Sequence, residues 1–250
     1  MRRTVCAAAV AASVTMLAAQ ADAAFFNFVD FANGIVPPGG SGPTGEGNVG
    51  TFGNVLLGGN VFTVDGVRVR ATASNTTVGI TTPFPYLDAG TGDLIGPDRN
   101  AAGLGVCQQA GSVQGCAGIG DDNIDYGGVS GNKEILSLEF LDEPQDIIRL
   151  IFRDQNHSDV FPVAAGTSPE VDIRVNGGNF VTYVLANDFF PANPIDAFFG
   201  VKTIDFRFNN GDFYLSAMTA VPIPAALPLF ATALAGLGLL GWRRRARGTA

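Results

Sequence analysis

An acidic stretch that begins at Asp121 has the residue types for binding a cation. Asp121, Asn123 and Asp125 place oxygen side chains at alternate positions, as the first ligands of a calcium loop are placed. The EF-hand pattern is not completed, because Tyr126 stands where glycine is needed and Asn132 where a bidentate glutamate is needed. The stretch therefore predicts either a structural calcium site, the only cofactor we expect, or a solvated Asp-rich turn.

A second polar run, residues 153–159, contains the single histidine of the chain, His157. A Ser-His-Asp arrangement would have to use this residue, yet no Gly-x-Ser-x-Gly segment is present to hold a nucleophile. A glycosidase needs only two carboxylates, but with 23 acidic residues their number does not discriminate. We therefore expect no enzyme, and a loop histidine bonded to neighbouring carboxylates.

The first 23 residues have the three parts of a secretory signal peptide. Arg2 and Arg3 precede an uncharged apolar stretch, residues 5–19, and Ala21 and Ala23 form a small-x-small cleavage site. We expect signal peptidase to cut after Ala23 and the chain to be exported. The alternative, an uncleaved anchor, is disfavoured because the apolar run is short for a membrane span.

The other end of the chain has the pattern of a single membrane span. Residues 225–242 are uncharged, and as a helix they would reach roughly 27 Å, close to the thickness of the bilayer core. A basic cluster follows within residues 243–247 and predicts a cytoplasmic C-terminus. Its members are Arg243, Arg244, Arg245 and Arg247.

A proline-bearing motif directly precedes this span. It consists of Val221, Pro222, Ile223, Pro224 and Ala225. Motif, span and arginine cluster together resemble the PEP-CTERM sorting signal of Gram-negative bacteria, in its VPLPA-CTERM variant, with isoleucine where that variant usually has leucine. The resemblance covers residues 221–250. Prolines should keep the motif extended, without helix or sheet hydrogen bonds, and so presented to a protease.

The resemblance implies a processing route. An exosortase, a membrane-embedded cysteine transpeptidase-like enzyme, would recognise the motif and remove the span. The chain would pass through an inner-membrane-tethered intermediate and end at the cell surface or outside the cell, often alongside exopolysaccharide. A plain C-terminal anchor that is never processed is the alternative, since a span and a basic stop are enough for anchoring.

Residues 24–220 remain as the exported body. The whole chain has 15 basic and 23 acidic residues, and without six arginines and Asp22 the body keeps 9 and 22, a net charge of −13. This acidity argues against nucleic-acid binding, which needs clustered basic residues. Cys6 leaves with the signal peptide, so Cys107 and Cys116 remain as a pair that we expect to form a disulfide.

The body is rich in glycine and phenylalanine, which favours an all-β domain. Four runs alternate apolar and polar residues as half-buried strands do: 67–71, 136–140, 171–175 and 204–208. Residues 147–152 are apolar apart from Arg149, which predicts a central strand buried on both faces. We expect roughly eight to ten strands in an antiparallel β-sandwich or jelly-roll-like ectodomain.

Turn residues predict how the strands connect. Residues 176–179 and 209–212 contain Asn and Gly between strand runs and predict two hairpins. Residues 34–50 read as a Gly/Pro-rich spacer loop, and residues 82–132 as a long loop that contains the disulfide. The body is also loosely similar to the β-rich ectodomains found ahead of such sorting tails, with residues 206–215 as the final hairpin.

The sequence as a whole predicts an exported, non-catalytic surface or extracellular-matrix protein, associated with exopolysaccharide or the cell envelope. The alternatives are a calcium-dependent glycan-binding module and a secreted hydrolase. Glycan-binding modules use aromatic platforms. The candidates in the body are Phe84, Tyr86, Tyr126, Tyr183 and Tyr214. Two phenylalanine pairs, 189–190 and 198–199, should belong to the core or form an apolar patch for a partner.

Overall fold

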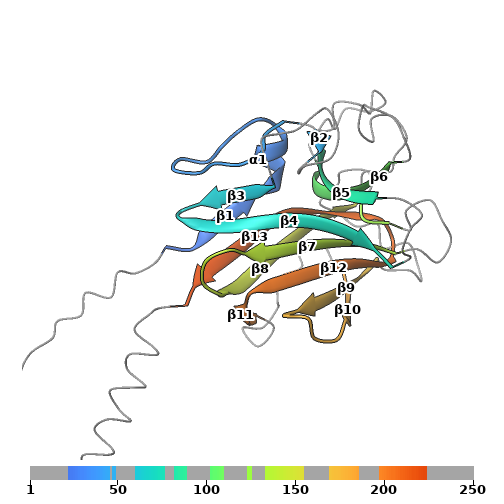
Figure 1. Cartoon of the computed structure of the whole chain (residues 1–250). Helices are drawn as coiled ribbons and strands as arrows, with labels where there is room; N and C mark the ends of the chain where they lie inside the picture. Colours follow the sequence, from blue (N-terminus) through green and yellow to red (C-terminus); the bar gives the residue numbers. More distant parts are fainter. Residues whose placement is uncertain are drawn as a thin grey trace, which may run out of the picture. The chain divides into compact units, whose positions relative to one another are not determined.

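A computed structural model describes most of the predicted body. The described residues are 22–45, 47–48, 60–76, 82–88, 102–109, 123–125, 133–154, 169–185 and 197–223. They belong to one compact unit, Asp22–Ile223, built almost entirely of antiparallel strands (Figure 1). In this part of the chain no helix is long and apolar enough to span a membrane.

The strands form two sheets. Sheet A has the order β11-β8-β13-β6-β5-β2, with β1 also paired to β13, and sheet B has the order β10-β9-β12-β7-β4-β3. Sheet A comprises β1 (Ala24–Asn27), β2 (Gly47–Asn48), β5 (Thr82–Asp88), β6 (Gly103–Gln109), β8 (Gln145–Asp154), β11 (Phe198–Val201) and β13 (Phe213–Pro222). Sheet B comprises β3 (Val61–Val64), β4 (Val67–Asn75), β7 (Glu134–Phe140), β9 (Glu170–Val175), β10 (Val181–Val184) and β12 (Thr203–Asn210). The predicted all-β class is confirmed.

One hydrophobic core joins the two sheets. Phe152 of β8 meets Phe206 of β12 edge to face, with ring centroids 5.7 Å apart, and Phe213 of β13 lies 5.6 Å from the same ring. Among the described residues the core begins at Ala24 and ends at Ala220. Two antiparallel sheets around one core are the arrangement of a β-sandwich.

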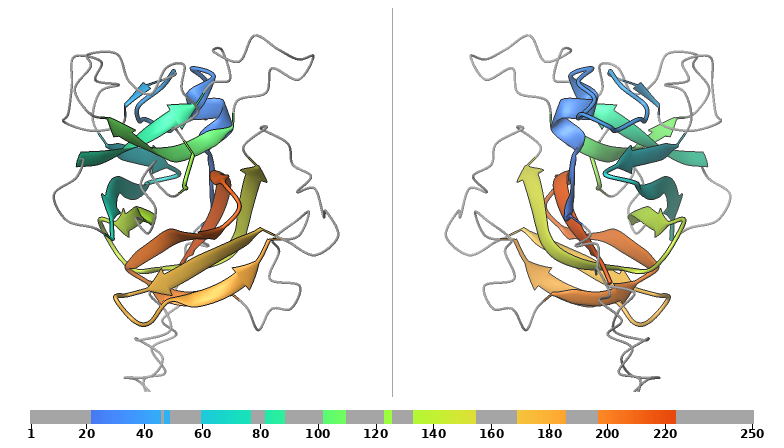
Figure 2. Two further views of the ribbon diagram at one scale, coloured as in Figure 1. Left: turned by 90° about the vertical axis from the view of Figure 1, so that its right-hand side faces the viewer. Right: turned by 90° about the vertical axis from the view of Figure 1, so that its left-hand side faces the viewer.

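The segment after the predicted signal peptide is part of this core. β1 pairs with β13, with Ala24 opposite Ala220 and Asn27 opposite Ala217. A short helix, α1 (Phe28–Ala32), follows, and the side chain of Asn27 caps it by accepting a hydrogen bond from the Asp30 backbone N–H at 3.3 Å. The helix packs against β5 and β6 and beside β13 (Figure 2).

One of the two predicted hairpins is confirmed and one is wrong. β9 and β10 pair across the turn at Asn176 and Gly177, both of which have positive φ. β12 and β13, by contrast, belong to different sheets, so the segment 209–212 is no hairpin and neither is 206–215. Each of these strands already has neighbours on both sides, and the turn therefore carries the chain from sheet B to sheet A.

The strand predicted over residues 147–152 exists as part of β8, but it is not buried on both faces. Ile148 is 44% exposed. The register between β8 and β13 shifts at this point, because Thr219 opposes Arg149 whereas Ala220 opposes Ile147. Such a bulge changes which face successive side chains occupy, and it leaves Ile148 outside.

The long loop predicted over residues 82–132 contains two strands, β5 and β6, which pair with each other from Thr82–Gln109 to Asp88–Gly103. Pro83 and Pro85 make the sequence of β5 look like a loop. Prolines are tolerated in this strand because its neighbour on one side, β2, is only two residues long. Gly103 hides β6. Its φ is +120°, and a Cβ there would lie 2.6 Å from the Leu215 carbonyl oxygen, so this glycine permits the close approach of β6 to β13.

The predicted Gly/Pro-rich loop, residues 34–50, contains the two-residue strand β2 near its end. Within the described part of this segment, the other extended contact is an isolated bridge between Ser41 and Thr63 of β3. The rest of its described residues form turns and irregular backbone, as the composition predicts.

Candidate functional site

The outer face of sheet B carries two neighbouring ion pairs between β9 and β12. β9 and β12 alternate buried apolar residues with polar residues, so their polar side chains share this face. Arg207 lies directly opposite Asp172, and Asp205 directly opposite Arg174. Both pairs form ion pairs with a shortest N–O distance of 2.6 Å. The register of two strands therefore creates a ladder of alternating charges.

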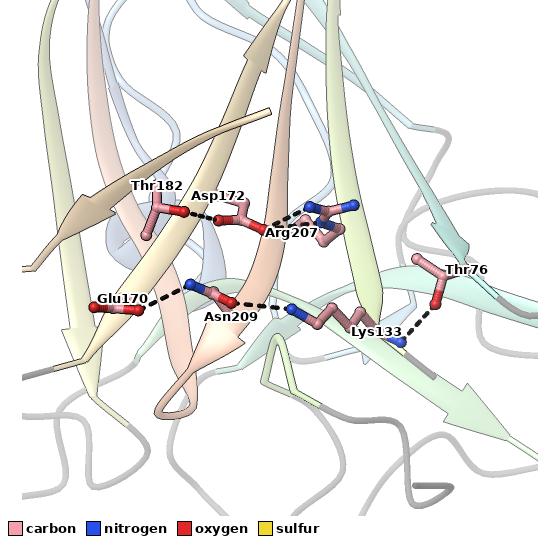
Figure 3. A network of polar contacts seen from close by, with 7 residues as sticks. All are labelled: Thr76, Lys133, Glu170, Asp172, Thr182, Arg207 and Asn209. Carbon is pink, nitrogen blue, oxygen red and sulfur yellow. Dashed lines mark hydrogen bonds and ion pairs between the residues drawn. The ribbon is translucent and has the colours of Figure 1, made fainter. Parts of the chain in front are cut away.

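Asp172 is the centre of the first hydrogen-bond chain on this face (Figure 3). Its Oδ2 accepts from Arg207 Nη2 at 2.6 Å and Nε at 3.1 Å, and its Oδ1 accepts from the Thr182 hydroxyl at 2.7 Å. The Asp172 side chain is only 6% exposed. Partners of this kind offset the free-energy cost of burying a carboxylate so far from water.

A second chain runs parallel to the first and ties four strands together (Figure 3). Asn209 donates from Nδ2 to Glu170 Oε2 at 2.9 Å and accepts from Lys133 Nζ at 3.0 Å. The backbone N–H of Lys133 donates to the Thr76 hydroxyl at 2.9 Å. This series of hydrogen bonds thus fixes the ends of β9, β12, β7 and β4 relative to one another.

An aromatic ring adjoins the charge ladder. Phe180, which follows the β9–β10 turn and is half-buried, lies 3.8 Å from the Arg207 Cζ and 4.5 Å from the Arg174 Cζ, measured to the ring centroid. Two guanidiniums against one ring form cation–π contacts. Ring, guanidiniums and carboxylates together offer the groups that bind hydroxyl-rich or anionic ligands. We name this set, Asp172, Arg174, Phe180, Asp205 and Arg207, the Phe180 site.

The opposite end of the same face has exposed ion pairs. Arg70 Nη1 lies 3.2 Å from Glu139 Oε2, with both side chains over 40% exposed. Arg68 pairs with Asp142 in the turn after β7, and its hydrogen bond lowers the pKa of the Asp142 carboxyl below the ordinary value. These pairs are solvated and contribute little to stability.

The predicted calcium stretch is described only in part. Asn123 and Asp125 flank a bridge between Ile124 and Phe213, and Asp121 lies outside the described residues. Asn123 is buried, and among the described residues its Oδ1 has no hydrogen-bond partner. Among the described residues no group of three His, Cys, Asp or Glu side chains is placed to hold a metal ion. The calcium site stays a prediction.

Glu134, at the start of β7, is a residue of this region that sequence reasoning missed. Its side chain is fully buried, and its Oε2 accepts from the Asp125 backbone N–H at 3.0 Å. The Glu134 backbone N–H in turn donates to the Asp125 carbonyl at 3.1 Å. No spacing in the sequence marks this glutamate, because its partner lies in a separate segment.

Asp212, between β12 and β13, is half-buried, and burial raises the pKa of its carboxyl above the ordinary value of 3.8. The folded chain therefore binds more protons than the unfolded chain as this group titrates, so stability falls as the pH rises through that range. We expect Asp212→Asn to raise Tm by about 1–2 °C at pH 7. The gain in Tm should vanish well below pH 3.8, where the protonated Asp212 carboxyl is as uncharged as the asparagine of the variant.

The matched control for this measurement is Asp142→Asn. Because the hydrogen bond from Arg68 lowers the pKa of Asp142, loss of that charge should lower Tm slightly at pH 7, the opposite sign. Thermal melts of both variants between pH 3 and pH 7 check the pair. A lower Tm for Asp212→Asn at pH 7 would contradict the role of burial at this position.

The predicted sorting motif does not lie wholly outside the sheet. Val221 and Pro222 are the last residues of β13 and oppose Asp146 and Gln145 of β8. The prediction that prolines keep the motif free of sheet pairing is therefore wrong for these two residues. A proline at the end of a strand removes only one donor, and pairing can continue through it. Ile223 lies beyond the strand and is 36% exposed.

Several other predicted site residues lie outside the described residues. They are Ala21, Cys116, His157, Pro224, Ala225, Arg243, Arg244, Arg245 and Arg247. Ala23 is described and exposed, directly before β1. Cys107 is fully buried on β6, in a small cluster with Phe84 and Tyr86. Its pairing with Cys116 stays a prediction.

The predicted aromatic platforms are mostly unsuitable. Phe84, Tyr86 and Tyr214 are buried, so none of them offers an open ring face. Tyr183 is half-buried and meets Phe198 edge to face at 6.0 Å. Tyr126 lies outside the described residues, and sequence reasoning missed Phe180 because nothing marks it as the ring beside two arginines.

The two predicted phenylalanine pairs differ in how much of them is described. Phe189 and Phe190 lie outside the described residues. On β11, Phe198 packs against the core while Phe199 is 64% exposed. The pair on β11 is therefore divided between core and surface.

Fold and site together define an all-β protein of two antiparallel sheets with a charged outer face on sheet B. No family model, no curated protein and no solved structure matches the chain.

Proposed function

We propose that the protein is an exported, non-catalytic surface or extracellular-matrix protein that carries a PEP-CTERM/VPLPA-CTERM-type sorting signal in residues 221–250. Signal peptidase cuts after Ala23, and an exosortase removes the span, residues 225–242, with the arginine cluster. The body remains at the cell surface or is released, in association with exopolysaccharide or the cell envelope.

The observation that carries this proposal is the position of the core relative to the two predicted processing points. Among the described residues the core begins at Ala24 and ends at Ala220, and these two alanines oppose each other in sheet A. The first residues after the predicted signal peptide and the last residues before the motif are therefore paired with each other, directly inside the two predicted processing points. A chain whose two ends are to be trimmed needs this arrangement in order to stay folded afterwards.

Intact mass of the full chain from two bacterial hosts, one with and one without an exosortase, tests the proposal. We expect loss of residues 1–23 in both hosts and loss of the tail only in the host that has the enzyme. The unreduced product should also be lighter than the reduced one by two hydrogen atoms, if Cys107 and Cys116 are paired. A product that retains Trp242 and the arginines in both hosts would support the plain anchor instead.

Glycan binding is the second candidate, and the Phe180 site supports it. The half-buried Phe180, its two guanidiniums and their two carboxylates supply aromatic and polar groups that a sugar can contact. In this case Phe180→Ala should abolish binding to the host exopolysaccharide with no change in fold. Calcium dependence would appear as a Tm that falls with chelator. Release of reducing sugar would instead favour the hydrolase.

A further inference from the structure

β13 carries the first two residues of the sorting motif inside sheet A. Val221 and Pro222 oppose β8 and are half-buried, whereas Ile223 follows the strand and is exposed. The boundary between paired and unpaired backbone therefore lies within the motif, between Pro222 and Ile223.

The residues of β8 that face the motif are themselves fixed. Asp146 Oδ1 accepts a hydrogen bond from the Gly200 backbone N–H of β11 at 2.8 Å. Gln145 is buried, and its Nε2 donates to the Glu143 carbonyl at 2.9 Å. The motif therefore begins opposite β8, a strand whose other edge is paired with β11.

The other side of β13 is held by β1. The pairing extends from Asn27–Ala217 to Ala24–Ala220, and both terminal alanines are fully buried. Phe26 of β1 is also fully buried and stacks near Phe28, at 6.3 Å between centroids. Strands therefore fix β13 on both sides as far as Ala220, directly before the motif.

An enzyme that cuts a peptide bond binds its substrate as extended backbone and pairs with its N–H and C=O groups. Val221 and Pro222 cannot make such pairs with an enzyme on the side of β8 unless the end of β13 first opens, and opening costs free energy. Ile223 is already outside the strand. Cleavage after Ile223, the first residue outside the strand, is therefore favoured over cleavage within β13 or directly after it.

We propose that the folded sheet sets the N-terminal limit of processing, so that the bond cut lies after Ile223 or a later residue and the mature chain keeps β13 whole. This inference rests on the proposed function, in which an exosortase removes the tail. In the reaction one peptide C–N bond breaks, its carbonyl carbon bonds to the oxygen of water or the nitrogen of an amine acceptor, and the leaving nitrogen takes the proton released by that acceptor.

The C-terminal residue of the processed full-length chain, determined by intact mass and sequencing of the C-terminal peptide, tests this limit. We expect the product to end at Ile223 or at a later residue that precedes the arginine cluster. An end at Pro222 or earlier would overturn the inference and leave the proposed function standing. Retention of the whole tail would overturn the proposed function, and the inference with it.

An insertion separates the effect of the sheet from the preference of the enzyme. Gly-Ser-Gly placed between Ala220 and Val221 moves the motif away from β8, so we expect products that end at Val221 or Pro222 to appear and processing to become several-fold faster. The control is the same insertion between Gly177 and Gly178, in the exposed β9–β10 turn. Identical product ends and rates in both variants would mean that the enzyme alone selects the bond, and the proposal would be overturned.

Discussion

Phe62→Ala is expected to lower the free energy of unfolding by about 3–5 kcal/mol, the range for removing a buried aromatic ring. Phe62, on β3 of sheet B, is fully buried between Phe28 and Phe31, whose ring centroids lie 5.2 and 5.0 Å away in edge-to-face geometry. Since Phe28 and Phe31 belong to α1, this ring joins the N-terminal segment to sheet B. Denaturant unfolding of the processed body measures the loss.

Phe199→Ala is the matched control, because it removes the same ring from a side chain that is 64% exposed. Its effect should stay within about 0.5 kcal/mol. A loss below about 1 kcal/mol for Phe62→Ala would contradict the packing of α1 against β3. A loss of the expected size would also mean that the segment directly after Ala23 contributes to the stability of the whole fold.

The sequence predicts sheet B far better than sheet A. The four alternating runs correspond to parts of β4, β7, β9 and β12, all of which belong to sheet B. These strands have a solvated outer face, so their sequences alternate with period two. Their apolar side chains and the confirmed β9–β10 turn could therefore be identified without a structure.

Two missed strands, β5 and β6, lie in sheet A, and their burial does not alternate. Residues 84–88 of β5 and 103–107 of β6 are buried at every position. A strand that is covered on both faces lacks the alternation of polar and apolar residues by which a strand is identified in a sequence. The glycines and prolines of β5 and β6 are also residue types that are common in loops, so the sequence pattern predicts a loop there.

The Phe180 site could not be predicted either, since cross-strand register creates it. Asp172 and Arg207 are far apart in the chain, and only the pairing of β9 with β12 places them opposite each other. Alternation alone placed polar residues on one face of each strand. Which carboxylate meets which guanidinium depends on strand order, and local sequence does not encode that order.

Arg207→Met is the second large effect that we expect, a loss of about 2–4 kcal/mol, somewhat below the range for breaking a fully buried pair. Methionine keeps the apolar stem of the side chain but leaves the carboxylate of Asp172, which is 6% exposed, with the Thr182 hydroxyl and without a cation. Arg207 is itself 25% exposed, so some water can reach the pair and lessen the loss.

Arg70→Met provides the control on the same face of the same sheet, because the pair of Arg70 with Glu139 is exposed on both sides. Its loss should not exceed about 1 kcal/mol. In the double variant Arg207→Met with Asp172→Asn, the buried charge is gone, and we expect part of the stability to return. Equal losses for Arg207→Met and Arg70→Met in denaturant unfolding would show that Asp172 does not depend on its cation. The Phe180 site would then be a solvated surface rather than a preorganised one.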